Sequence, residues 1–174
     1  MKSQNTHLKP QDILLLLKIV SHDKEDWLQK PMSESLGLSQ SEISESVARC
    51  KYAGFLDPKG KTVMKSALMD FLAYGLRYVF PQKPGAIVRG IPTAHSASPL
   101  DEKIQSDENF VWPYAKGHMR GQSIIPLYPS IPHAVLNDKK LHELLALSDA
   151  LRVGRNREKE LAITELKKRF KIGK

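Results

Sequence analysis

The chain has 174 residues, and its 27 lysines and arginines outnumber its 19 aspartates and glutamates by eight. With 41% hydrophobic and 26% charged residues, the composition excludes a wholly disordered chain, because such chains combine few apolar residues with a high net charge. No apolar run reaches the roughly 18 residues that cross a bilayer, and the N-terminus is too polar for a signal peptide. A single cysteine excludes an internal disulfide. We expect a cytoplasmic protein that does not bind membranes, and its basic charge favours nucleic acid as a partner.

Charge and proline content divide the sequence into three parts. Residues 1–80 carry 11 basic and 9 acidic side chains, residues 81–136 carry 5 and 4, and residues 137–174 carry 11 and 6. Eight of the 11 prolines lie in the middle part, which predicts extended chain and turns, because proline interrupts helices. We therefore expect a mainly α (α+β) fold with a helical domain, a Pro-rich extended segment and basic C-terminal helices.

Two helices open the first part. Pro10 suits the first position of a helix, and the apolar residues that follow it recur at helical spacing, which predicts a helix over residues 10–21. A short helix over residues 29–36 should end at Gly37, and the apolar pair before it could add a brief strand.

A third helix begins directly after this glycine. Ser39 and Glu42 have the spacing of a capping box, which predicts a helix over residues 40–53. Its apolar residues fall at i, i+4 and i+7 and predict one buried stripe, formed by Ile43, Val47 and Cys50. Two helices joined by a short turn that contains glycine form a helix-turn-helix arrangement.

The segment from Trp27 to Leu56 has a Leu-Gly-Leu-Ser-Gln-Ser-Glu-Ile-Ser core and an Ala-Gly-Phe-Leu ending. It resembles the winged-helix DNA-binding domains of bacterial MarR-type regulators, and the likeness covers about residues 8–80. In that family the helix after the glycine turn enters the major groove, and a β-hairpin wing touches the flanking backbone. The resemblance implies a sequence-specific transcriptional regulator that binds double-stranded DNA. We expect it to bind as a homodimer, with each copy contacting one of two half-sites.

Transferred to this chain, the resemblance implies that the side of the third helix opposite the buried stripe faces the DNA groove. Ala48 lies on this side as well. Gln40 would pair with adenine and Glu45 with a cytosine amine. The wing is short, because only residues 57–61 separate two apolar pairs. The candidate DNA-binding residues are Ser39, Gln40, Ser41, Ser44, Glu45, Arg49, Lys51, Lys59 and Lys61.

Another class of function fits the same residues. Helix-turn-helix units also serve as scaffolds, so the alternative is a protein-binding adaptor or antitoxin-like protein that holds a protein partner through residues 81–174. A further helix, predicted over residues 66–80, either forms the homodimer or packs on the first helix.

The middle part offers a belt and a predicted hairpin. Residues 85–100 are too apolar for a solvated linker and should pack against the first domain. Residues 110–114 and 118–127 could pair as a β-hairpin anchored by Trp112 and Tyr114. Such a hairpin would be either a second nucleic-acid contact or a lid on the core.

The last part returns to helical patterns. Asp138 can cap a helix whose leucines share one face, and a second helix is expected over residues 157–170. The basic side chains of these helices form either a solvated face or an arm that contacts phosphates or an acidic partner.

Catalytic and cofactor motifs are missing from the sequence. The six histidines are scattered without metal-ligand spacing, and there is no phosphate-binding loop and no nucleophile elbow. His95 is surrounded by small residues, but no acid or base partner can be named for it. We expect no enzyme, no cofactor and no metal.

Overall fold

The computed structural model describes residues 5–173 and confirms a mainly helical α+β fold. This part of the chain contains eight α-helices and one small three-stranded sheet. The helices are α1 (Pro10–His22), α2 (Gln29–Leu36), α3 (Gln40–Tyr52), α4 (Lys65–Tyr74), α5 (Leu76–Val79), α6 (Ile131–Ala134), α7 (Lys139–Val153) and α8 (Asn156–Phe170). The strands are β1 (Ile87–Pro92), β2 (Phe110–Pro113) and β3 (Met119–Ser123), and two short 3-10 helices, η1 (Ala94–Ser96) and η2 (Leu100–Glu102), lie between β1 and β2. None of the described helices has the length and apolar character needed to span a membrane.

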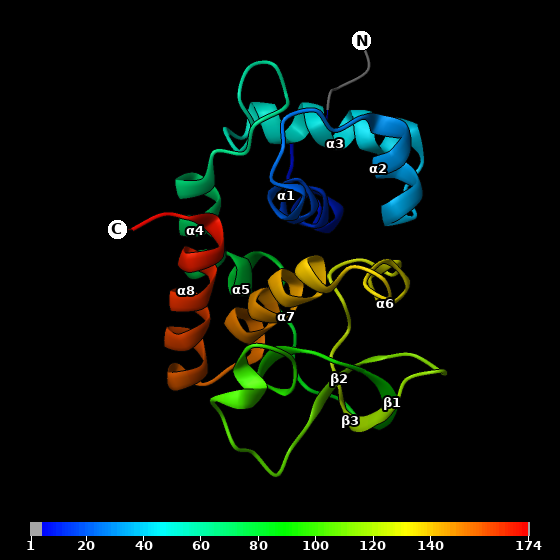
Figure 1. Ribbon diagram of the computed structural model, residues 1–174, viewed down its shortest axis with the longest axis vertical. Helices are drawn as coiled ribbons and strands as arrows, with labels where there is room; N and C mark the ends of the chain where they lie inside the picture. Colours follow the sequence, from blue (N-terminus) through cyan, green and yellow to red (C-terminus); the bar gives the residue numbers. More distant parts are fainter. Residues whose placement is uncertain (1–4, 174) are drawn as a thin grey trace.

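The molecule is elongated, with α3 at one end and the sheet at the other (Figure 1). Helix α7 lies between these ends and contacts α1, α4, α5, α8 and η1. It is buried on nearly all sides, since every residue from Leu144 to Arg152 is buried. The central position of α7 makes it the element on which the N-terminal helices and the sheet both pack.

The leucine-rich first helix joins α3 to this centre. Helix α1 packs on α3 and on α7, and its residues from Ile13 to Leu17 are completely buried. A helix that is apolar around its whole circumference is expected where protein covers every side. Burial of five such side chains makes α1 the common core of the upper half of the molecule.

A buried carboxylate ties the middle part of the chain to α7. Asp149 accepts hydrogen bonds from the Thr93 hydroxyl (2.8 Å), from Trp112 Nε1 (2.6 Å) and from Arg152 Nη1 (2.9 Å). Arg152 in turn donates to the carbonyls of Phe80 (2.9 Å) and Ile125 (3.3 Å). Residues far apart in the sequence are thereby held on one face of α7.

The predicted hairpin is wrong, because β2 and β3 run parallel to each other. Strand β1 pairs antiparallel with both: Ile91 lies opposite Trp112 of β2, and Arg89 lies opposite Arg120 of β3. Two strands that are both antiparallel to a third must be parallel to one another. The predicted belt over residues 85–100 supplies that third strand, which the sequence pattern did not reveal.

The helix predicted over residues 66–80 is two helices, because α4 ends at Tyr74 and α5 begins after Gly75. The glycine packs closely on Phe71, where an added Cβ would lie 2.9 Å from the Phe71 ring. Leu76 is completely buried, whereas Val79 is half exposed. The break thus changes which side chains face the core.

Candidate functional site

The turn between α2 and α3 has the geometry that the sequence predicts. Gly37 adopts a left-handed conformation (φ +65°), which glycine reaches without strain. Ser39 then caps α3: its hydroxyl accepts from the Glu42 amide (3.1 Å), and the Glu42 carboxylate accepts from the Ser39 amide (2.8 Å). These hydrogen bonds from Ser39 lower the pKa of Glu42. The carboxylate of Glu42 is therefore committed to fixing the start of α3.

The outer face of α3 is exposed along its whole length. Ser41, Ser44, Ala48 and Lys51 follow one another at spacings of three or four residues, and all four are exposed. α3 lies near one end of the molecule, with α1 on its inner side and the loop that follows α3 reaching further out (Figure 1). Gln40 and Glu45 border this stripe and are exposed as well, the Glu45 side chain to 64%. We call the exposed side chains of residues 40, 41, 44, 45, 48 and 51 the outer face of α3.

The segment after α3 is a minimal hairpin. Leu56 and Val63 form a single antiparallel bridge, and the turn between them is closed by Asp57, whose Oδ1 accepts from the amides of Lys61 (2.7 Å) and Thr62 (2.8 Å). These backbone hydrogen bonds lower the pKa of Asp57. This turn lies where the sequence analysis expects a short wing.

Gly60 brings this turn against α3. Its φ is +71°, and a Cβ at this position would lie 2.9 Å from Val47 Cγ1 and 3.2 Å from Lys51 Cδ. Such close approach requires glycine. Lys59 precedes it and is exposed, so Lys51 and Lys59 present two ammonium groups beside the C-terminal half of α3.

Arg49 is not on the outer face, and the sequence-based assignment of Arg49 as a DNA contact is corrected here. Its guanidinium is buried (6% exposed) and forms a fork with Asp12, with Nε 2.9 Å from Oδ2 and Nη2 2.7 Å from Oδ1. Ser46 donates to the same carboxylate (2.5 Å), and Asp12 also accepts from the Lys9 amide (2.8 Å). The hydrogen bonds with Asp12 raise the pKa of Arg49. Arg49 thus fastens α3 to α1.

Lys61 is also occupied within the chain. Its ammonium group donates to the Trp27 carbonyl (2.6 Å) and lies 4.4 Å from the centre of the Trp27 ring, a cation–π distance. Trp27 Nε1 donates back to the Lys61 carbonyl (3.0 Å). Residues 27–28 form no strand, contrary to the expectation, and these mutual contacts instead fix the turn to Trp27. Lys61, predicted to contact DNA, is therefore engaged within the chain.

Two features of this region escaped the sequence analysis. Tyr52 is 75% exposed and follows Ala48 by four residues, so helical spacing alone would have added it to the outer face. Residues from the Pro-rich middle part touch the helical pair: the Tyr128 hydroxyl donates to Glu42 (3.2 Å), and the Ser130 hydroxyl donates to the Leu36 carbonyl (2.6 Å). Sequence separations of about 90 residues left no signal for these contacts.

The two side chains weighed as catalytic candidates, Cys50 and His95, are both buried. Burial raises the pKa of the Cys50 thiol to about 12, which leaves it without nucleophilic thiolate near neutral pH. His95 is buried, and its Nε2 donates to the Glu108 carbonyl (2.6 Å). Within residues 5–173, no group of three or more histidine, cysteine or acidic side chains is placed to hold a metal ion.

Comparisons with protein-family models, with curated proteins and with solved structures found no match to this chain.

Proposed function

We propose that this chain is a cytoplasmic transcriptional regulator of the bacterial winged-helix type, without enzymatic activity, that binds double-stranded DNA by inserting α3 into the major groove. The proposal depends on one observation: the outer face of α3 is exposed, while its inner face is held by α1 and α2. Helix-turn-helix proteins place the second helix of such a pair in the groove, where its N-terminal residues contact base edges.

The side chains of the outer face suit base recognition. Gln40, Ser41 and Ser44 lie in the first two turns of α3 and make no side-chain hydrogen bond within the described chain, so their polar groups are free for base edges. A Gln amide forms a bidentate pair with adenine, and a carboxylate such as that of Glu45 accepts from the cytosine amine. The Ser39 hydroxyl caps the helix and positions these residues.

Phosphate contacts would come from Lys51, at the C-terminal end of the outer face, and from Lys59 in the turn beside it. The rest of this part of the chain adds little positive potential, since the 11 basic and 9 acidic side chains of residues 1–80 leave a net charge of only +2. Because phosphate neutralisation supplies most non-specific affinity, a single copy should bind weakly. A homodimer that binds two half-sites would compensate for this.

Exposed aromatic side chains support the homodimer. Tyr74 and Tyr78 are about three-quarters exposed, and Val79 beside them is half exposed, on the helices that follow the wing. Exposed apolar side chains in a group mark interaction sites. We expect Tyr78→Glu to shift the chain from dimer to monomer in analytical ultracentrifugation, with Tyr52→Glu, an equally exposed tyrosine on α3, as the control that leaves the dimer intact.

The DNA-binding proposal is tested by selecting sequences from a random duplex library and measuring affinities by fluorescence anisotropy at several salt concentrations. Gln40→Ala should weaken the selected site about tenfold to a hundredfold and leave random duplex unchanged, because one bidentate base contact is worth about 1–3 kcal/mol. Lys51→Ala with Lys59→Ala should weaken all duplexes and lower the salt slope by about two.

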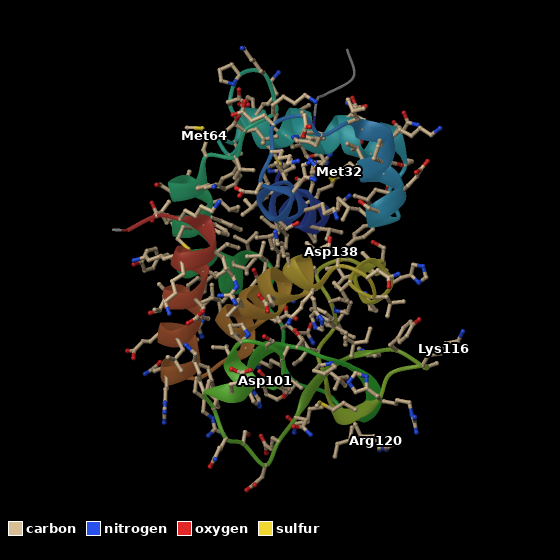
Figure 2. All side chains as sticks on the ribbon, in the orientation of Figure 1. Met32, Met64, Asp101, Lys116, Arg120 and Asp138 are labelled. Carbon is tan, nitrogen blue, oxygen red and sulfur yellow. The ribbon has the colours of Figure 1, made fainter. Side chains whose placement is uncertain are left out.

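Lys116→Ala is the matched control, because Lys116 is an exposed lysine at the opposite end of the molecule from α3 (Figure 2). It should change neither affinity nor salt slope. Absence of duplex binding at low salt would reject the proposal and favour the adaptor alternative, for which the small positive charge of residues 1–80 and the acidic Glu45 on the outer face are the supporting observations.

A further inference from the structure

A second exposed surface lies on the sheet, at the far end of the molecule from α3 (Figure 1). Arg89 of β1 and Arg120 of β3 are register partners in an antiparallel pair, and both are exposed. Partners in such a pair project from the same face of the sheet, about 5 Å apart at Cβ. The two side chains therefore start side by side on one outward face, where Arg89 Nη1 also lies 3.5 Å from the Gly117 carbonyl oxygen.

No carboxylate within the described part of the chain neutralises these arginines. Neither Arg89 nor Arg120 forms an ion pair in residues 5–173, whereas Lys103, Lys168 and Arg169 all pair with Glu165. Like charges directly opposite each other on a sheet reduce its stability. A surface that keeps two unpaired arginines in this register is complementary to a pair of negative charges.

An apolar residue adjoins the charged pair. Ile87 precedes Arg89 by two residues, shares its face and is 64% exposed, and its own register partner is Gln122. Ile125, just beyond β3, is 55% exposed. The face thus combines arginine forks with an exposed aliphatic side chain, and arginine is enriched in protein interfaces.

The charge around this face favours a protein over a nucleic acid. Residues 81–136 carry a net charge of only +1. Lys116 and Arg120 lie on one side of this end of the molecule, whereas Asp101 lies on the other (Figure 2). A polyanion needs an extended positive surface, whereas two localised arginines suit two localised carboxylates.

The topology favours a helix as the bound element. In the described chain each of the three strands already pairs with the other two, so the sheet offers no free edge to an added strand. On a helix, side chains at i and i+4 are about 5–6 Å apart at Cβ, which matches the spacing of the two arginines. A second copy of the chain, docked through the same face, would place arginines against arginines.

We propose that the face formed by Ile87, Arg89, Arg120 and Gln122 binds an acidic helix of a partner protein, with two carboxylates at i and i+4 held by the arginines and a neighbouring apolar side chain against Ile87. This adds a protein-binding site to the DNA-binding function proposed above and does not depend on it.

The test uses a phage-displayed library of a stable helical scaffold with random residues on one face, selected on the intact protein. Selected helices should carry two acidic residues spaced by three or four positions beside an apolar residue. Their affinity should fall about tenfold or more on Arg89→Glu or Arg120→Glu, as truncation of an arginine hot spot does. Selection without acidic enrichment, or without any enriched helix, would overturn the proposal.

Three controls make the result specific. Arg157→Glu changes an exposed arginine on α8 and should leave binding of the selected helices unchanged, as should Gln40→Ala, whatever the DNA experiment shows. Circular dichroism melting should show that the Arg89 and Arg120 variants remain folded. If a single-stranded or duplex oligonucleotide displaces the helices and binds with the same dependence on both arginines, the face binds nucleic acid and the acidic-helix proposal is rejected.

Discussion

The buried fork between Arg49 and Asp12 leads to the sharpest prediction about stability. Asp12 is fully buried and Arg49 is 6% exposed, and their two shortest contacts are 2.7 and 2.9 Å. Arg49→Met removes the positive partner and leaves the carboxylate with only the Ser46 hydroxyl and the Lys9 amide as donors. Removing one partner of a buried ion pair costs about 3–5 kcal/mol, because the remaining charge stays desolvated.

A loss of this size is large for a domain whose total stability is about 5–15 kcal/mol. For a chain of this length it corresponds to a fall in melting temperature of about 10 °C. Urea unfolding followed by circular dichroism measures it, provided that the slope m is unchanged. Arg49→Lys keeps the charge but loses the fork and should cost less. In the double variant with Asp12→Asn the cost of Arg49→Met should shrink, because the buried negative charge is gone.

Two results would refute this reasoning. One is a fall in the free energy of unfolding of less than about 1 kcal/mol for Arg49→Met. Such a small fall would mean that removal of Arg49 does not leave the Asp12 carboxylate as an uncompensated buried charge. The other is a folded Arg49→Lys protein with normal stability that has lost duplex affinity and part of its salt slope, which would return Arg49 to the role of a phosphate contact.

Three further predictions follow from buried polar groups. Hydrogen bonds from Lys103, Lys168 and Arg169 lower the pKa of Glu165 from 4.5 to about 2. The stabilising contribution of the Glu165 carboxylate is therefore present above pH 4.5 and is lost as the pH falls toward 2. In urea titrations, the Glu165→Gln variant should be about 2 kcal/mol less stable than the parent at pH 7 and equally stable at low pH. Cys50, with its pKa near 12, should react with a thiol reagent at pH 8 only after urea is added, and rapid stoichiometric reaction of the folded protein would contradict its burial. Asp149→Ala should cost about 3–5 kcal/mol in the same unfolding assay because Arg152 is left unpaired, and Asp149→Asn, which keeps an acceptor for Trp112, should cost less; equal losses would show that the hydrogen bonds do not matter.

The sequence alone determined the local features of the helical part. Pro10, Gly37 and the Ser39–Glu42 capping box act within a few residues of themselves, so the starts of α1 and α3 and the turn between α2 and α3 could be predicted closely. The same holds for Asp138, whose carboxylate accepts from the Leu141 amide as a cap (3.0 Å). Helical spacing also identified the exposed side of α3, because the buried stripe and the outer face follow the same period.

Only the tertiary structure decided what the charged and extended residues do. Whether Arg49 faces solvent or Asp12 depends on an element 37 residues earlier in the chain, and whether β2 and β3 form a hairpin depends on β1, which adds a third strand from another segment. A charged side chain has the same sequence signature in either environment, and strand pairing is set by long-range contacts. The buried Asp12–Arg49 pair at one end of the molecule and the unpaired Arg89 and Arg120 at the other are therefore properties of the tertiary fold. No local sequence pattern encodes them.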